Sequence, residues 1–283
     1  MKAFSSVANG KINLSLDITG IRPDGYHEVA MVMHSVPLFD VVTVEVGEGE
    51  GITLEISDKT LPTDSKNIAY RAAEKYLDRI NEKSRIYIRI KKNIPVGAGM
   101  AGGSTDAAAV LKCLNRAFDE RLDEKELMEI GLTLGADVPF CIKGGCCLSE
   151  GIGEVLTEIP TLKGKKLLVA KPNFSVSTKD VYTEYDHTEI KKRPDTKAVI
   201  EAVKNNDILA LKESTHNVLE EVTKGIHPEI GVIEDIMYSH KADLSMMTGS
   251  GPTVFGFFQK DEDIKTCADK LKETLKDVCI LKI

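Results

Sequence analysis

Several features are missing from this sequence, and each absence narrows the class of protein. No apolar run approaches the roughly 20 residues that a helix needs to cross a bilayer. The first residues are also too polar for a signal peptide. Basic residues are not in excess, because the net charge is −7 and the pI is about 5.5. We therefore expect a cytoplasmic protein that binds neither a membrane nor nucleic acid.

Metal-binding and P-loop signatures are missing as well. The six cysteines form no C-x-x-C pair and are scattered through apolar segments. Since a zinc site needs clustered cysteine and histidine, the sequence predicts reduced, buried thiols instead. The pattern G-x-x-x-x-G-K-[ST] does not occur, which excludes the ordinary P-loop.

The periodicity of apolar residues predicts a mixed α+β protein. Alternation predicts strands over residues 12–18, 41–46, 52–56, 85–90, 167–170, 254–258 and 278–283. Spacings of three and four predict helices over residues 64–80, 107–118, 123–134, 195–204, 208–223, 228–240 and 261–276. The first helix would be capped by Asp64 or Ser65, and the third would start at an Asp123 capping box and stop at Gly135. A charged stretch at 161–166 predicts two domains, 1–160 and 161–283.

A glycine-rich loop is the main chemical signal. Gly97, Gly99, Gly102 and Gly103 lie close together, and a helix opens at 104–106. Residues without a Cβ let several backbone N–H groups face one anion, and the helix adds its positive end. Ser104 or Thr105 could cap that helix or reach a metal-bound phosphate. The pattern predicts a polyphosphate cradle, with a purely structural turn as the alternative.

The same loop also satisfies G-x-G-x-x-G, which leaves a dinucleotide-binding oxidoreductase open. Against it, residues 91–96 separate the strand from the first glycine, and several strands and a helix come first.

Four segments in the same order resemble the GHMP kinase superfamily. One is the loop Pro95, Val96, Gly97, Ala98, Gly99, Met100, Ala101, Gly102, Gly103, Ser104, Thr105, Asp106. Another is the later glycine motif at 247–255. The segments 10–14 with 22–28, and 134–140, resemble one family within it, the kinases of the non-mevalonate isoprenoid pathway. Asn9 and Gly10 depart from the Pro-Ala or Tyr-Ala that is usual there.

The resemblance implies a two-domain GHMP kinase fold, α+β, with a ribosomal protein S5 domain 2-like N-terminal domain and a ferredoxin-like C-terminal domain. It implies that ATP and Mg²⁺ phosphorylate the 2-hydroxyl of the methylerythritol part of a CDP-alcohol, CDP-methylerythritol. ATP would bind the N-terminal domain, 1–160, and the substrate would bind 161–283. The protein would be a monomer or a weak homodimer.

The catalytic roles would fall on Asp137 and Lys11. Asp137 would take the proton of the attacking hydroxyl, and Lys11 would pair with it and stabilise the developing charge. We expect Asp137 at a helix-to-strand junction, because Pro139 biases Val138 toward extended backbone. Asn13 shares the face of Lys11 along its strand and could bond a substrate hydroxyl. The alternatives are a turn or cap role for Asp137, and solvent-facing positions for the other two.

Binding roles follow from the resemblance. Tyr26 and His27, after the Asp24-Gly25 turn, would stack on cytosine and hydrogen-bond it, with a packed ring and an exposed imidazole as the alternative. Further binding residues are Tyr182 as a second ring against cytosine, Thr178 at the substrate, Asn67 and Asp106 near adenine, Gly249 and Gly251 shaping the second loop, and Ser104 as a metal contact.

Two further rivals remain. One is a related kinase that acts on mevalonate-type acceptors or homoserine, which carry no base for Tyr26 and His27. The other is a non-catalytic module of the same fold, which would have no use for both Lys11 and Asp137.

Overall fold

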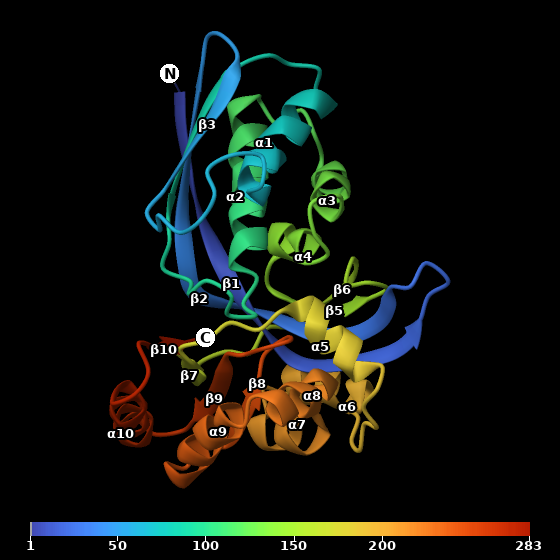
Figure 1. Cartoon of the computed structure of the whole chain (residues 1–283), viewed down its shortest axis with the longest axis vertical. Coiled ribbons are helices and arrows are strands. Elements are labelled where there is room, and N and C mark those ends of the chain that lie inside the picture. The colour runs from blue at the N-terminus through green and yellow to red at the C-terminus, as the bar shows by residue number, and fades with distance from the viewer. Residues whose placement is uncertain (1) are drawn as a thin grey trace. The chain divides into compact units, whose positions relative to one another are not determined.

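The computed structural model describes residues 2–283 and divides into two compact units (Figure 1). The first unit contains the chain up to Gly10, Leu38–Ile94 and Ala101–Gly144. The second contains Lys11–Pro37, Pro95–Met100 and Gly145–Ile283. The predicted mixed α+β class is confirmed. The units are interleaved, however, and so differ from a simple division after residue 160.

In the first unit, four helices lie on one face of the strands (Figure 1). The strands are the first part of β1 (Lys2–Ile21), the last part of β2 (His27–Gly47), β3 (Gly51–Ile56) and β4 (Arg85–Lys91). The helices are α1 (Ile68–Arg79), α2 (Gly102–Ala117), α3 (Glu124–Leu132) and α4 (Val138–Lys143). β4 pairs antiparallel with the end of β2 and parallel with β3. Alternate residues of β4, such as Ile86 and Ile88, are fully buried against Tyr76 and Leu111 of the helices.

The second unit holds the first part of β2, which pairs with β5 (Cys146–Glu150), and β5 pairs with β6 (Val155–Ile159). A separate antiparallel sheet has the order β10-β7-β9-β8. Its strands are β7 (Lys166–Lys171), β8 (Leu244–Met247), β9 (Val254–Phe258) and β10 (Asp277–Lys282). The helices are α5 (Thr178–Tyr185), α6 (Thr196–Lys204), α7 (Ile208–Ser214), α8 (Val218–Ile226), α9 (Glu229–Ser239) and α10 (Asp261–Lys272).

All seven predicted strands are present, but some helix ends were wrong. α1 begins at Ile68, because the side chain of Asn67 accepts a hydrogen bond from Ala69 N and caps the helix. Asp64 instead closes a turn by accepting from Lys66 N. The Asp123 capping box is confirmed, but α3 ends at Leu132 and not near Gly135.

Two further predictions were wrong, each for a local reason. The predicted helix 208–223 is two helices, since Thr215 is extended and Asn217 caps α8. The predicted strand after Asp137 is the helix α4, because Pro139 lies in its first turn, where a missing N–H costs nothing. The short elements β5, β6, β8 and α5 were not predicted.

Within residues 2–283, no helix is long and apolar enough to cross a membrane, and no cluster of His, Cys, Asp or Glu could hold a metal ion. All six cysteines are free thiols, four of them buried.

Candidate active site

The first glycine loop uses left-handed backbone at three positions, Gly97 (φ 64°), Gly99 (φ 69°) and Ala101 (φ 59°). α2 begins directly after Ala101, and no side chain caps it. The predicted cap by Ser104 or Thr105 is therefore wrong, because both lie inside the first turn. Thr105 Oγ1 instead donates to Asn9 O at 2.7 Å. The start of α2 thus keeps the uncapped N–H groups that bind anions.

At Gly97 and Gly99, close contacts within the second unit leave no room for a side chain. A Cβ on Gly99 would lie 2.7 Å from Thr248 O and 2.8 Å from Gly251 O. A Cβ on Gly97 would lie 2.5 Å from Ser175 Oγ. The two glycine loops are therefore in backbone contact, which only residues without a side chain permit.

The second glycine loop brings Lys11 to the same place. Gly249 (φ 59°) and Gly251 (φ 87°) both use left-handed backbone. A Cβ on Gly249 would lie 3.2 Å from Gly99 O and 3.4 Å from Lys11 Nζ. The backbone N–H of Lys11 also donates to Met100 O. The ammonium of Lys11 thus lies where the two loops meet.

Asn13 holds the Lys11 side chain. Lys11 Nζ donates to Asn13 Oδ1 at 2.7 Å, which confirms that both residues face the same side of β1. Asn13 N donates to Thr248 Oγ1 at 2.9 Å. Lys11 is 4% exposed and Asn13 is fully buried, so their predicted alternatives as solvated surface residues are wrong.

Asp137 lies in the first unit at the start of α4, half-buried, with helical backbone and no capping hydrogen bond from its side chain. As the turn-or-cap alternative predicts, Asp137 occupies the N-cap position of α4, but its side chain makes no capping hydrogen bond. Gly131 lets α3 and α4 approach, because a Cβ there would lie 2.8 Å from Val138 Cγ1. A Cβ on Gly135 would lie 3.9 Å from Ser104 Oγ, so the segment before Asp137 runs beside the first turn of α2. The pairing of Asp137 with Lys11 stays a prediction.

A buried ion cluster in the first unit, which the sequence analysis did not predict, joins Lys92 to Asp40 and Asp106. Lys92 Nζ donates to Asp106 Oδ2 at 2.6 Å and also to Asp40. Asp40 Oδ1 accepts from the backbone N–H groups of Asn93 and Ile94. Burial raises the pKa of Asp106 to about 7, although the charge of Lys92 opposes the rise. The side chain of Asp106, predicted near adenine, is thus engaged with Lys92.

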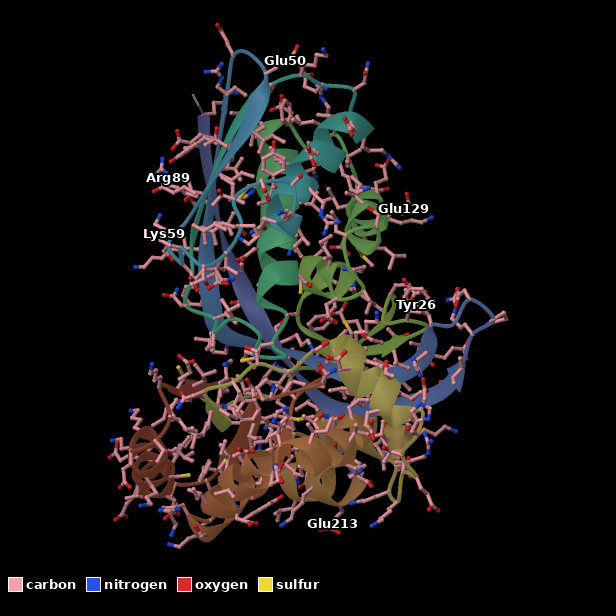
Figure 2. All side chains as sticks on the ribbon, in the orientation of Figure 1. Tyr26, Glu50, Lys59, Arg89, Glu129 and Glu213 are labelled. Atoms are coloured by element: carbon pink, nitrogen blue, oxygen red, sulfur yellow. The ribbon has the colours of Figure 1, made fainter. Side chains whose placement is uncertain are left out.

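The predicted cytosine residues gather in the second unit around His27. His27 Nε2 lies 2.8 Å from Asp186 Oδ1, and its ring centroid lies 4.9 Å from that of Tyr182. The side chain of His27 is 12% exposed, so the exposed-imidazole alternative is wrong. Tyr26, labelled in Figure 2 on the turn between β1 and β2, is 62% exposed and unpacked. Asp186 was missed, because a carboxylate in a polar segment carries no sequence signal.

The remaining predicted residues are placed as follows. Thr178 Oγ1 lies 2.8 Å from Ser250 Oγ, which sets the start of α5 beside the second loop. Asn67 caps α1 and donates to Pro62 O, so the predicted adenine contact would use its remaining lone pair and hydrogen.

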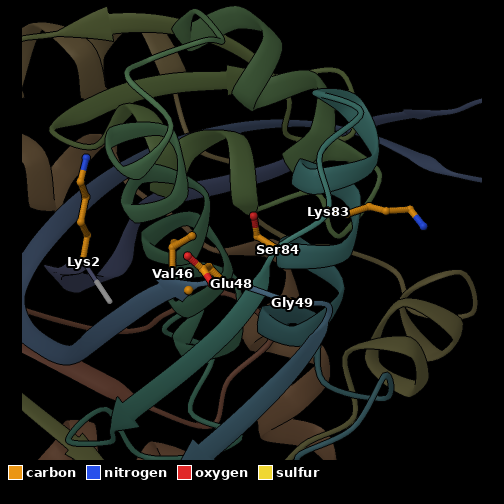
Figure 3. A pocket seen from close by; sticks show the side chains of 7 residues that line it. Lys2, Val46, Glu48, Gly49, Lys83 and Ser84 are labelled. Atoms are coloured by element: carbon orange, nitrogen blue, oxygen red, sulfur yellow. The ribbon is translucent and has the colours of Figure 1, made fainter.

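A surface hollow in the first unit contains none of the predicted site residues (Figure 3). It is lined by Lys2, Val46, Gly47, Glu48, Gly49, Lys83 and Ser84.

Comparison with known families defines the class. The model of the GHMP kinases N-terminal domain matches residues 67–145, and that of the GHMP kinases C-terminal domain matches residues 199–277. Two glycine loops and the mixed α+β fold agree with these matches. The dinucleotide-binding alternative is thereby excluded.

Individual relatives narrow the class to one family. The 4-diphosphocytidyl-2-C-methyl-D-erythritol kinase of Caldicellulosiruptor saccharolyticus is 45% identical over 96% of this chain and 94% of its own length. That of Clostridioides difficile is 47% identical over 97% of this chain and 93% of its own. A solved structure of 4-(cytidine 5'-diphospho)-2C-methyl-D-erythritol kinase superposes with a TM-score of 0.83 at 29% identity, covering 99% of this chain and 100% of that one. The chain belongs to this family of GHMP kinases.

The homoserine kinase of Cytophaga hutchinsonii has a TM-score of 0.79 at 17% identity, covering 100% of this chain and 96% of that one, which shows a shared fold alone.

Proposed function

We propose that this kinase transfers the γ-phosphoryl group of ATP to the 2-hydroxyl of 4-diphosphocytidyl-2-C-methyl-D-erythritol, in the cytoplasm, as a step of non-mevalonate isoprenoid precursor synthesis. The observation that carries the proposal is the buried ammonium of Lys11 at the contact between the two glycine loops. A cation held there would stabilise the negative charge that accumulates during phosphoryl transfer.

The triphosphate would bind along residues 95–103 and at the start of α2. Its oxygens would accept from backbone N–H groups that no capping side chain covers. Mg²⁺ would neutralise part of the charge of the phosphates. The hydroxyl of Ser104 fits as a protein ligand, because it lies in the first turn and makes no hydrogen bond with any residue from 2 to 283.

The acceptor hydroxyl would give its proton to Asp137. The segment before Asp137 runs beside the first turn of α2 in the first unit, which supports this role. Lys11, held by Asn13, would stabilise the forming alkoxide and the moving phosphoryl group.

The cytosine base would be recognised in the second unit. Tyr26 offers an exposed ring for stacking, and Tyr182 supplies a second ring beside His27. Mevalonate and homoserine offer no base to these rings, which favours the CDP-alcohol over the related acceptors.

The test is an ATP-coupled assay with the CDP-alcohol, mevalonate and homoserine as parallel acceptors. We expect turnover with the CDP-alcohol alone, and a requirement for added Mg²⁺. Turnover of mevalonate or homoserine, with none of the CDP-alcohol, would overturn the proposal.

A further inference from the structure

His27 is held from three sides by the C-terminal end of one helix. Tyr182 lies against its ring at 4.9 Å between centroids, and Tyr185 approaches edge-on at 6.0 Å. Asp186, the C-cap of α5, places Oδ1 2.8 Å from His27 Nε2. These residues follow one another on α5, so the imidazole has little freedom to turn.

The end of α5 is itself anchored to β1. Arg193 donates to the hydroxyl of Tyr185 at 3.2 Å. The same guanidinium donates to Asp17 Oδ1 at 2.6 Å and to Ile18 O at 2.7 Å. The hydrogen bond to Tyr185 and the charge of Asp17 raise the pKa of Arg193, which stays a cation at every ordinary pH. The position of Asp186 opposite His27 is therefore fixed by contacts on both sides.

The Asp186 contact decides which ring nitrogen of His27 carries the proton. An ionised carboxylate can only accept hydrogen bonds, so Nε2 must be the N–H that donates to Asp186. In a neutral imidazole, Nδ1 is then a lone-pair acceptor. Nδ1 makes no hydrogen bond to any residue between 2 and 283.

An acceptor at this point distinguishes the two pyrimidines. The 4-position of cytosine carries an amino group, which donates, whereas uracil carries a carbonyl oxygen there, which only accepts. A site that must receive a hydrogen bond rejects the ligand that cannot give one, because two lone pairs would then face each other.

We propose that Asp186 is a positioning residue that makes His27 Nδ1 the acceptor for the 4-amino group of cytosine and so excludes uracil. The inference rests on the proposed function in one respect, namely that the base binds beside His27. Asp186 does not touch the substrate and acts through the imidazole.

The test measures binding of CDP and UDP by calorimetry at pH about 8, where an ordinary histidine is neutral. We compare the unaltered protein with Asp186→Ala and with Asp180→Ala. The latter is a matched control, because Asp180 belongs to the same helix, is exposed and bonds only through its backbone.

We expect the unaltered protein to bind CDP at least about tenfold more tightly than UDP. Asp186→Ala should weaken CDP binding roughly five- to tenfold while UDP binding changes less than about twofold. Asp186→Asn, which keeps an oxygen acceptor, should restore part of the preference, and Asp180→Ala should leave it unchanged. Equal weakening of CDP and UDP would mean a merely structural role and would overturn the inference.

A second readout does not depend on the kinase reaction. In ¹⁵N-histidine spectra of the ligand-free protein, His27 should show a protonated Nε2 and an unprotonated Nδ1, and Asp186→Ala should mix the two forms. A protonated Nδ1 in the unaltered protein would also refute the inference. If the CDP-alcohol is phosphorylated while these results fail, only the role of Asp186 is lost. If CDP binds as expected while the assay fails, the proposed reaction is lost instead.

Discussion

Two glycines of the first loop, Gly99 and Gly103, are required for different reasons. At Gly99 the protein itself forbids a side chain, because a Cβ would meet two carbonyl oxygens. At Gly103 the nearest atom to a Cβ would be Ile68 Cδ1 at 3.6 Å, an ordinary contact, and the φ angle is not positive. No contact within residues 2–283 therefore explains Gly103, whereas a phosphate at the helix start would.

The variant Gly103→Ala tests whether Gly103 is required for phosphate binding and not for folding. Alanine is favoured over glycine within a helix by about 1 kcal/mol, so the free energy of unfolding should stay the same or rise. The KM for ATP should rise at least about tenfold, because a methyl group would stand over the N–H groups that receive the phosphates. Gly231→Ala in α9, where a Cβ would meet no atom within 4 Å, is the matched control and should leave KM unchanged. Equal KM values for the two variants would contradict phosphate binding at this turn.

Asp137→Ala tests the general base. We expect the variant to fold, because the side chain of Asp137 makes no capping bond to α4. The kcat should fall roughly 10²- to 10⁴-fold, the usual contribution of a positioned base. Asp123→Ala gives the reverse pattern, because it removes the capping box of α3 and should cost about 1 kcal/mol with normal kcat. A near-normal kcat for Asp137→Ala would remove this residue from the mechanism.

At the scale of elements, one face of α8 holds the second glycine loop. Asn217 Nδ2 donates to Met247 O at 2.9 Å and to Gly249 O at 2.8 Å. Glu220 Oε2 accepts from Met247 N at 2.6 Å, and Thr223 Oγ1 donates to Ser250 O at 3.3 Å. Residues three apart share a helix face, so this helix fixes the backbone that lies against Lys11.

Asn217→Ser tests this support. Serine keeps an oxygen to cap α8, but it loses both donors to the loop. We expect the free energy of unfolding to fall by about 1–3 kcal/mol, because two buried carbonyl groups lose a partner. We also expect kcat to fall at least about tenfold, because about 1.4 kcal/mol of transition-state stabilisation corresponds to one factor of ten.

The control is Asp207→Ser at the cap of α7, where serine also replaces a capping side chain. It should cost stability without lowering kcat. A kcat for Asn217→Ser no lower than that of Asp207→Ser would show that α8 supports the fold and not the reaction.

At the scale of the whole molecule, each unit buries a carboxyl group whose pKa is raised. Burial raises the pKa of Asp106 to about 7 in the first unit and that of Glu234 to about 8 in the second. Both groups share a lysine with another carboxylate, namely Asp40 or Glu220. A group whose pKa is raised on folding binds its proton more tightly in the folded state. Its contribution to stability is therefore complete at low pH and is lost as the pH rises.

This predicts a difference between the unaltered protein and Asp106→Asn. Between pH about 4 and about 7, the free energy of unfolding of the unaltered protein should fall relative to the variant by up to about 1.4 kcal/mol per pH unit. Urea denaturation at several pH values measures the difference, in which the other titrating groups cancel. Parallel pH profiles for the two proteins would mean that Asp106 is ionised in the folded state throughout.

Local patterns in the sequence foretold much of the fold and part of the site. Alternation of apolar residues predicted β3 and β4 but only part of the long strands β1 and β2, since one buried face imposes a period of two. The shared face of Lys11 and Asn13 followed from the same period. Asn67, Asn217 and Pro139 misled the helix predictions, because a cap or a break depends on one side-chain bond that no period records.

By itself, the sequence determined the α+β class, the two glycine loops, the family, and the side of β1 that carries the ammonium. Each of these features depends on residues that are close together in the chain, or on short motifs of consecutive residues. Only the tertiary structure decided that Gly99 touches the second loop, that Lys92 joins Asp40 to Asp106, and that Asp186 faces His27. These contacts join residues that are far apart in the chain. Their stability comes from burial and from charges at short distance, and neither produces a periodic pattern in the sequence.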